Sequence, residues 1–362
     1  MKTVLVSTGG GRYDVVVGHS LLAGLGAAQA RRVHGGQVVV CVDDNVAPLY
    51  LEAVTGSLRT EGLSVSQIVI PAGESQKSLA RAEELYGILY DRGLHRSDTV
   101  VALGGGVIGD LVGFVAATFQ RGVRLVQVPT TLLAQVDASV GGKVAVDFRG
   151  AKNYVGTFYQ PHLVAADLDV LASLPPRELR SGAAEAAKHG LLGGGSLLRR
   201  VERFASAGAT ASAVTEALVA GNVAYKAAIV GEDEREVSGR RAVLNLGHTA
   251  GHAIEAATGF ARFTHGEGVG LGLRCALWLS QRLTGLSAEA VARAQALLDG
   301  VGAPGRLTGV TADEVIALIA RDKKASDKGV GYVLLEELGR PVVGVSVPPE
   351  LEREAVEWLL TR

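Results

Sequence analysis

The stretch "TVVALGGGVIGDLVGFVAATF", residues 99–119, decides the fold. A run of β-branched and apolar residues leads into a cluster of glycines, and a longer apolar segment with helical spacing follows. This order predicts a buried strand, a tight turn and a helix. A membrane span is disfavoured because an unpaired Asp110 in lipid would cost roughly 2.5 kcal/mol or more. A strand that leads directly into a helix is the repeating unit of α/β domains.

The same alternation extends to both sides of this stretch. Residues 78–93 have a helical pattern, and other alanine- and leucine-rich segments separate apolar runs. The runs predicted to be strands are residues 3–7, 13–18, 37–42, 66–71, 99–104 and 123–129. Strands that alternate with helices predict a mostly parallel, Rossmann-like sheet covered by helices. We assign residues 1–172 to this α/β N-terminal domain.

After residue 172 the pattern becomes mainly helical. Ser173 is a candidate helix cap before two prolines, and Thr311 with Glu314 forms a capping box. Long helical patterns occupy residues 212–230, 268–283 and 288–298, and a strand pair is predicted at 331–338 and 341–347. We assign residues 173–362 to a mainly α-helical C-terminal domain and expect the active site in the cleft between the domains.

The composition restricts the class of protein. The formal net charge is −1 over 362 residues, which argues against nucleic acid or an acidic membrane surface as the main partner. Cys41 and Cys275 lie in apolar stretches, so we expect reduced core thiols in an intracellular, cytoplasmic protein. Only 9 of the 36 basic residues are lysines, and most of these lie in the motifs described below.

The glycine cluster is a candidate dinucleotide site. Gly104-x-Gly106-x-x-Gly109 stands between a predicted strand and a predicted helix, where a pyrophosphate is able to approach the backbone. Asp43, Asp44 and Asn45 end another predicted strand, where carboxylates bind ribose hydroxyls. A turn without a ligand and an ordinary Asx turn are the alternative interpretations.

The central stretch, residues 128–153, combines polar and basic residues with glycines. Two ammonium groups near a glycine-rich backbone form a plausible pocket for a phosphate or a carboxylate, whereas solvated surface lysines are the alternative. The candidate residues are Thr130, Thr131, Asp137, Lys143, Lys152 and Asn153.

Three histidines and one glutamate form a candidate metal site. If residues 245–252 are helical, Asn245, His248 and His252 share one face. His265 follows after a loop, and Glu185 with Lys188 shares a face of an earlier helix. Two imidazoles and one carboxylate are typical of catalytic zinc, although histidines four residues apart are often structural. The spacing leaves open which histidine is not a ligand.

Taken together, these motifs resemble those of the 3-dehydroquinate synthase family. The resemblance covers nearly the whole chain and rests on "GGGVIGDLVGF", "VPTTLLAQVDASVGGK", "AKN", "EAAKHG", "NLGHTAGH" and "HGEG", in the family's order and spacing. One departure is Asp147, which stands where the family usually has asparagine. An extra residue between Lys226 and Asn245 leaves Arg240 and Arg241 as alternatives for one position.

The resemblance implies a role for each matching residue. It implies NAD contacts from Asp43, Asn45, Glu74, Lys77, Gly105, Gly106, Asp110, Thr130, Thr131, Asp137, Lys143 and Lys152. It implies zinc or cobalt ligands at Glu185, His248 and His265. It implies catalytic or substrate contacts from Lys143, Lys152, Asn153, Lys188, Lys226, Arg241, Asn245, His252 and Lys323 (or Lys324), and from Arg121 across a homodimer interface.

The family's reaction converts a sugar phosphate, 3-deoxy-D-arabino-heptulosonate 7-phosphate, into 3-dehydroquinate and phosphate. It proceeds by transient oxidation, phosphate β-elimination, re-reduction and aldol closure, as the second step of the shikimate pathway. The alternatives are a related sugar-phosphate cyclase, a metal-dependent polyol dehydrogenase and an inactive NAD-binding protein. The scarce lysines at 143, 152 and 188 favour a substrate with anionic groups.

Overall fold

The computed structural model describes residues 1–30, 36–325 and 331–362, without the side chains of residues 30 and 322–325. The chain forms two compact units. The first unit contains Met1–Leu174 and Thr215–Arg235, and the second unit contains Pro175–Val214 and Glu236–Arg362. The sequence analysis placed one boundary after residue 172, whereas the structure returns residues 215–235 to the first unit.

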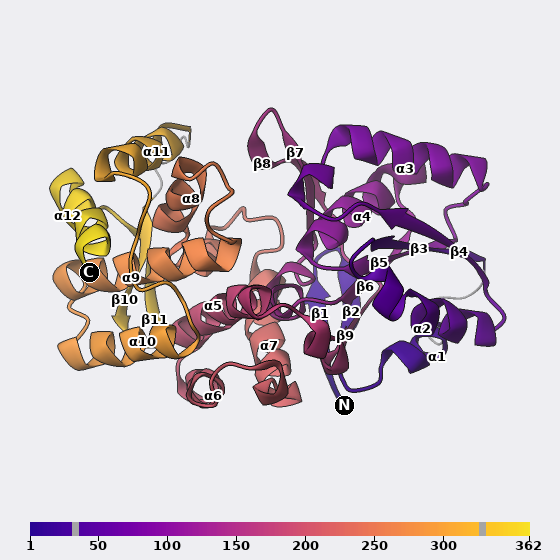
Figure 1. The fold of residues 1–362 in the computed structure, drawn as a ribbon, viewed down its shortest axis with the longest axis horizontal. Helices are drawn as coiled ribbons and strands as arrows, with labels where there is room; N and C mark the ends of the chain where they lie inside the picture. The colour runs from indigo at the N-terminus through magenta and orange to yellow at the C-terminus, as the bar shows by residue number, and fades with distance from the viewer. Residues whose placement is uncertain (31–35, 326–330) are drawn as a thin grey trace. The chain divides into compact units, whose positions relative to one another are not determined.

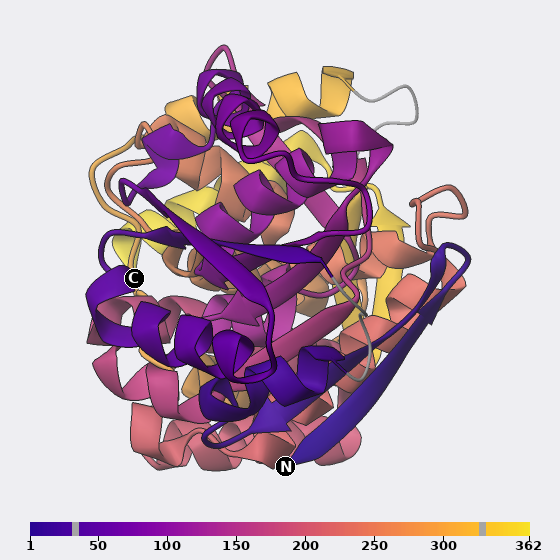
Figure 2. The same cartoon turned by 90° about the vertical axis from the view of Figure 1, so that its right-hand side faces the viewer.

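The first unit is built on a mostly parallel sheet, as predicted. In its described residues the sheet has seven strands in the order β1-β2-β9-β6-β5-β3-β4. The β1–β2 hairpin, indigo in Figure 2, is antiparallel and forms one edge, and the other neighbours pair in parallel. The bounds are β1 (Lys2–Thr8), β2 (Gly11–Gly18), β3 (Gln37–Asp43), β4 (Ser64–Ile70), β5 (Thr99–Gly104), β6 (Arg124–Pro129) and β9 (Leu163–Asp167).

Strand β3 shows why these runs form a central sheet. Val39 and Cys41 face one hydrophobic cluster, and Val38, Val40 and Val42 face another. The first cluster includes α3 (Leu79–Asp91) and α4 (Gly106–Thr118), and the second includes α1 (Leu25–Ala30) and α2 (Ala47–Thr60), on opposite faces of the sheet (Figure 1). Because successive side chains alternate between faces, a strand buried on both sides reads as a continuous apolar run.

Three strands were not predicted from the sequence. Strand β9 has five residues and two alanines, too weak a signal to separate from a loop. Strands β7 (Lys143–Phe148) and β8 (Ala151–Phe158) form a separate antiparallel hairpin in the basic central stretch. Residues of β8 are mostly exposed or half-buried, so its hydrophobic pattern is faint.

Helix α7 (Glu216–Glu232) belongs to the first unit and packs against β1 and β2. A Cβ at Gly231 would lie 2.8 Å from the backbone oxygen of Ser7, so glycine permits this close approach. The short helices of this unit are η1 (Leu22–Gly24), η2 (Glu74–Gln76), η3 (Phe119–Arg121), the π-helix η4 (Ala134–Ala138) and η5 (Leu168–Ser173).

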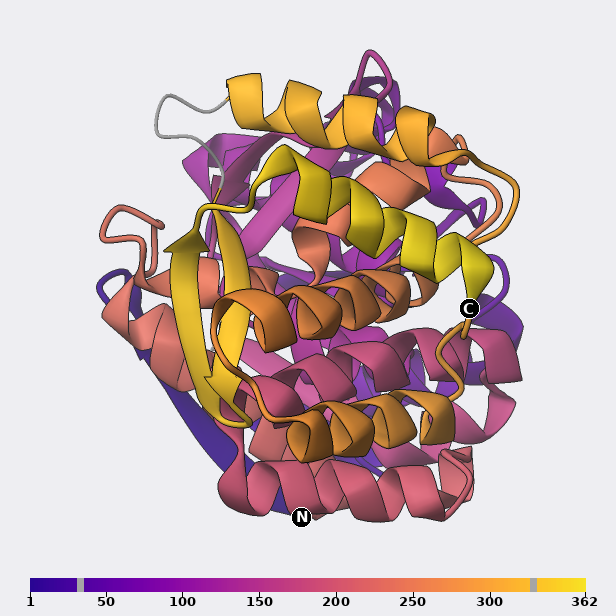
Figure 3. The same cartoon turned by 90° about the vertical axis from the view of Figure 1, so that its left-hand side faces the viewer.

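The second unit is mainly helical, as predicted, with the β10–β11 hairpin (yellow in Figure 3) beside α9. Its helices are α5 (Pro176–Gly193), α6 (Gly195–Ser206), η6 (Ala211–Ala213), η7 (Arg240–Asn245), α8 (His248–Ala257), α9 (His265–Leu283), α10 (Ala288–Gly300), α11 (Ala312–Ala325) and α12 (Pro349–Thr361). Its strands are β10 (Tyr332–Glu337) and β11 (Arg340–Val345). Among the described residues, no helix is both long and apolar enough to cross a membrane.

The two predicted helix caps have different outcomes. Thr311 and Glu314 form the expected capping box, because the Thr311 N–H donates to the Glu314 carboxylate and the Glu314 N–H donates to Thr311 Oγ1. The prediction that Ser173 caps a helix was wrong. Helix α5 begins after Pro175, and Ser173 instead donates to the Val170 oxygen and lies 2.7 Å from the Tyr50 hydroxyl.

Candidate active site

The glycine turn between β5 and α4 packs closely against neighbouring side chains. A Cβ at Gly104 would lie 2.8 Å from Ile108 Cβ, and one at Gly105 would lie 3.0 Å from Thr131 Cγ2. Gly105 caps α4 without a side chain, so the first N–H groups of this 13-residue helix are available to an anion. This helix N-terminus fits the pyrophosphate of a dinucleotide.

Asp43 serves the turn after β3 and also faces the glycine turn. Its Oδ1 accepts N–H groups of Asn45 and Val46, each at 3.0 Å, so the Asx-turn interpretation is correct. Its Oδ2 lies 3.1 Å from the Cβ position of Gly104. Burial raises the pKa of the Asp43 carboxyl. One oxygen therefore organises the loop while the other is directed towards the predicted cofactor site.

Thr130 adds a second feature that fits a polar ligand. It follows β6, its N–H donates to the Gly104 oxygen at 2.9 Å, and its side chain is buried. The Thr130 hydroxyl has no hydrogen-bond partner among the described residues. Buried hydroxyls are rarely left unsatisfied, so this oxygen beside the glycine turn fits a polar ligand such as NAD. The neighbouring Thr131 instead caps a short turn, accepting the Ala134 N–H.

Lys77 joins two other predicted cofactor or substrate residues. Its ammonium is 2.6 Å from Asp110 Oδ2 and also donates to Asn153 Oδ1. Burial disfavours the charged ammonium, but the carboxylate of Asp110 outweighs it and raises the pKa of Lys77. Burial also raises the pKa of Asp110, partly offset by Lys77. Asn153 has a left-handed φ of 55°, and Asp147 Oδ1 accepts its N–H at 2.8 Å.

Four other predicted residues of the first unit form two ion pairs. Lys152 lies 3.6 Å from Glu74 in a partly exposed ion pair. Lys226 is buried on α7, lies 2.5 Å from Asp137 Oδ1 and donates to the Asp137 backbone oxygen at 2.8 Å. Asp137 is part of the π-helix, whose altered hydrogen-bond pattern is frequent at functional sites. Lys143 and Arg121 are exposed, at the start of β7 and the end of η3.

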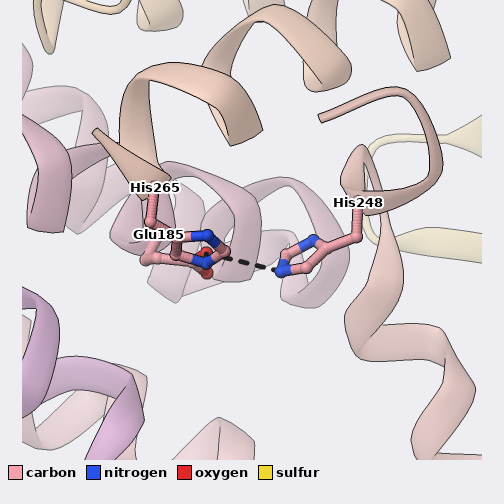
Figure 4. A group of neighbouring side chains, drawn as sticks. All are labelled: Glu185, His248 and His265. Atoms are coloured by element: carbon pink, nitrogen blue, oxygen red, sulfur yellow. Dashed lines mark ion pairs between the residues drawn. The ribbon is translucent and has the colours of Figure 1, made fainter. Parts of the chain in front are cut away.

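The second unit brings the three predicted metal ligands together (Figure 4). Glu185 Oε1 is 3.6 Å from His248 Nε2 and 3.3 Å from His265 Nε2. One donor atom from each residue lies within 4.8 Å of the others. Glu185 is fully buried, and its two side-chain oxygens have ion-pair contacts but no hydrogen-bond partner among the described residues. Two imidazoles and one carboxylate match the ligand types of catalytic zinc.

Further contacts orient the imidazole rings. Leu246 O lies 3.2 Å from His248 Nδ1, and Glu255 Oε1 lies 3.0 Å from His265 Nδ1. When each Nδ1 carries the proton and donates it to these acceptors, each Nε2 presents a lone pair towards Glu185. This arrangement fits a divalent metal ion.

The charges around Glu185 perturb the protonation of this group. Lys188, 2.6 Å away, and both imidazoles outweigh burial and hold the pKa of Glu185 well below its usual range. Burial and Lys188 lower the pKa of His248. Burial opposes the charged form of His265, but Glu185 and Glu255 raise its pKa to about 10. Glu185 is therefore an ionised carboxylate, as a metal ligand must be, and a bound metal ion would displace the second proton of His265 from Nε2.

The structure corrects one sequence prediction about this site. Asn245 does not share a helix with His248, because η7 ends at Asn245 and Gly247, with a φ of 79°, precedes α8. His248 and His252 do lie one turn apart, with ring centroids 5.1 Å apart, and His252 is exposed. Arg241 is buried 3.5 Å from Glu236.

The exposure of the side chains distinguishes Arg240 from Arg241, but not Lys323 from Lys324. Arg240, the alternative to Arg241, is exposed. The side chains of Lys323 and Lys324, on α11, lie outside the described residues.

Two residues that contact the site were not singled out as site residues. Glu255 lies seven residues after His248, the same spacing that was used for Asn245 and His252. A search for a further carboxylate at that helical spacing would have found it. Asp147 was noted only as a departure from the family pattern, and its contact with Asn153 depends on the β7–β8 pairing.

The comparisons with known proteins agree with these observations. Residues 67–181 match the family described as 3-dehydroquinate synthase N-terminal, and residues 182–325 match 3-dehydroquinate synthase C-terminal. A 3-dehydroquinate synthase from Paracoccus denitrificans is 43% identical over 362 residues, covering 98% of each chain.

Two solved structures are also similar. One is 2-epi-5-epi-valiolone synthase from Streptomyces hygroscopicus with NAD+ and Zn2+ bound, at 27% identity, 96% coverage of each chain and a TM-score of 0.87. A 2-deoxy-scyllo-inosose synthase complexed with carbaglucose-6-phosphate, NAD+ and Co2+ shares the fold at 24% identity and a TM-score of 0.87, covering 99% of this chain and 100% of that one. From the family matches and the identity along its whole length, the chain belongs to the 3-dehydroquinate synthase family.

Proposed function

We propose that this protein converts 3-deoxy-D-arabino-heptulosonate 7-phosphate into 3-dehydroquinate and phosphate, the second step of the shikimate pathway. A hydroxyl two carbons from the phosphate-bearing carbon is oxidised transiently, and the resulting ketone acidifies the intervening C–H. Phosphate leaves by β-elimination, the hydride is returned, and ring opening with aldol closure forms the carbocycle. The proposal is supported by the similarity to 3-dehydroquinate synthases along the whole chain.

The cofactors follow from the fit of the two sites. NAD held at the glycine turn would supply the hydride acceptor, and zinc or cobalt held by Glu185, His248 and His265 would supply Lewis-acid polarisation of the hydroxyl. His252 is exposed beside His248 and is assigned the relay of the proton lost in oxidation.

One observation carries the choice of a phosphorylated substrate. Lys188 is 2% exposed and lies 2.6 Å from Glu185, so a buried ammonium stands directly beside the metal donors. An ammonium is a strong partner for phosphate and carboxylate groups. We assign the same kind of substrate contact to Lys143, Lys152, Asn153, Lys226, Arg241, Asn245 and Lys323. A polyol dehydrogenase acts on neutral substrates and needs no such set of cations.

We also propose that the working unit is a cytoplasmic homodimer. Arg121 is exposed at the end of η3 with a left-handed φ of 62°, a conformation that is strained for arginine. Strained backbone concentrates at functional positions, which supports a role in which Arg121 reaches the phosphate site of the partner subunit.

The decisive experiment measures phosphate release and the NADH absorbance at about 340 nm in the same reaction. We expect many phosphates released per enzyme, with only catalytic NAD required and no lasting rise in absorbance. Stoichiometric NADH, or turnover of a simple polyol without phosphate release, would instead identify a dehydrogenase. Phosphate release with a different cyclic product would identify a related cyclase.

The metal assignment has a separate test. His248→Ala should lose bound metal and activity, because His248 supplies one of three donors. His252→Ala should keep metal and lose rate. Full metal content in the His248→Ala protein, measured by atomic emission after dialysis, would contradict the assignment of the ligands.

A further inference from the structure

We propose that Glu255 is a positioning residue that fixes the ring of His265 and strengthens metal binding. We propose further that position 268 is glycine because the side chain of Glu255 occupies the space that a Cβ would need. This inference rests on the metal site proposed above. It adds two residues to which neither the sequence analysis nor the proposed reaction assigns a role.

The geometry places His265 between two carboxylates. Glu255 on α8 is buried, with 3% of its surface exposed, and its Oε1 lies 3.0 Å from His265 Nδ1. The other ring nitrogen, Nε2, lies 3.3 Å from Glu185 Oε1. A proton held on Nδ1 by Glu255 leaves the Nε2 lone pair for a metal ion, and the hydrogen bond also fixes the ring plane. Without this contact the ring would be free to rotate or to change tautomer.

Gly268 provides the space for Glu255. It lies three residues after His265 on α9, and a Cβ built there would be 2.8 Å from Glu255 Cγ and 3.0 Å from Glu255 Oε1. The nearest atoms all belong to the side chain of Glu255, so a methyl group at 268 would displace that side chain. Glycine is a poor helix former, and a glycine inside a long helix therefore needs a reason such as this one.

The experiment measures metal affinity rather than activity. Apoprotein is titrated with Zn2+ in competition with a chromophoric chelator, for the unaltered protein and for Glu255→Ala, Glu255→Gln, Gly268→Ala and the double variant Glu255→Ala/Gly268→Ala. Glu202→Gln is the matched control, because Glu202 forms an exposed ion pair with Arg293 in the same unit. Circular dichroism verifies that each variant is folded.

We expect Glu255→Ala to weaken Zn2+ binding about 10- to 100-fold, the usual loss when such an outer contact is removed. Glu255→Gln should lose less, since its amide oxygen is still able to accept the Nδ1 proton, and it remains informative if the alanine variant does not fold. Gly268→Ala should also weaken binding. The double variant should bind no more weakly than Glu255→Ala, because alanine at 255 has no Cγ for the new methyl group to meet. Glu202→Gln should bind like the unaltered protein.

A spectroscopic readout separates positioning from general stability. Co2+-saturated Glu255→Ala should have an altered visible spectrum, because a rotated His265 changes the ligand geometry, whereas Co2+-saturated Glu202→Gln should not. The His252→Ala variant addresses another possibility, since His252, Glu255 and His265 also form a group with donor atoms within 4.8 Å. Retained metal supports positioning, whereas lost metal would favour the group of His252, Glu255 and His265 as the ligands and overturn the inference.

The failure of this inference is distinguishable from failure of the proposed metal site. If the unaltered protein binds Zn2+ and the Glu255 variants bind it equally well, only the positioning role is overturned. Additive losses in the double variant would overturn the explanation for Gly268. If the unaltered protein binds no Zn2+ or Co2+, both the metal site and this inference are wrong.

Discussion

Replacing Lys77 by methionine removes the cation beside a largely buried carboxylate. Lys77 is 4% exposed and its ammonium is 2.6 Å from Asp110, whose side chain is 21% exposed. Removing one member of a buried ion pair costs about 3–5 kcal/mol, because the other charge stays desolvated. Since water reaches a fifth of Asp110, we expect the lower end, about 3 kcal/mol. For a unit of this size that is roughly 6–12 °C in melting temperature.

Calorimetry at pH 8 compares Lys77→Met with two further variants. Lys152→Met is the matched control, because the Lys152–Glu74 pair is 3.6 Å apart with side chains 29% and 42% exposed, and such pairs contribute about 1 kcal/mol or less. The double variant Lys77→Met/Asp110→Asn should recover most of the loss, since it also removes the unpaired charge. Equal melting temperatures of Lys77→Met and Lys152→Met would refute the reasoning. So would a double variant whose melting temperature is no higher than that of Lys77→Met.

The loss of stability in Lys77→Met should also depend on pH. Burial already raises the pKa of Asp110 above its unfolded value, and removing Lys77 raises it further. A carboxyl with a raised folded pKa loses stability as pH rises through that pKa, because folding then forces a charge to be buried. The deficit of Lys77→Met should therefore be smaller at pH 5 than at pH 8. A deficit that grows on acidification would contradict this sign.

Three further outcomes are expected. Gly105→Ala should lower the free energy of unfolding by about 1–3 kcal/mol in a denaturant titration, because its Cβ would lie 3.0 Å from Thr131 Cγ2. Burial raises the pKa of Cys41 and of Cys275 to about 12, so neither thiol should react with a disulfide reagent at pH 8 until the protein is unfolded. Mixing Arg121→Ala and Lys143→Ala subunits should restore part of the activity, and no recovery after proven subunit exchange would count against the dimer.

The elements that were predicted correctly are those whose structure depends on residues close together in the sequence. The strand, turn and helix at 99–118 were correct because β-branched residues, glycines and helical spacing follow one another without interruption. Strand β9 was missed because five short, partly alanine residues become a strand only by insertion between β2 and β6. Asn245 was misplaced because periodicity alone does not reveal the left-handed Gly247 that begins a new helix.

In the candidate site, too, contacts within one element were predicted and contacts between separate elements were not. Glu185 and Lys188 were correctly predicted to share a helix face, since their spacing is local. The contacts of Glu255 with His265 and of Asp147 with Asn153 join separate elements, so one sequence does not predict them. The assigned roles of the substrate-contacting residues stay predictions until the variants are measured.

The return of α7 to the first unit affects how this protein folds on the ribosome. Strands β1 and β2 are made first, but the helix that covers them is synthesised only after α5 and α6 of the other unit. About 60 residues separate position 174 from the end of that segment, roughly 3–12 s of synthesis at 5–20 residues per second. During that interval the nascent sheet lacks one of its covering helices. A chain cut after residue 174 should therefore aggregate, whereas the same fragment supplied with residues 215–235 should become more soluble.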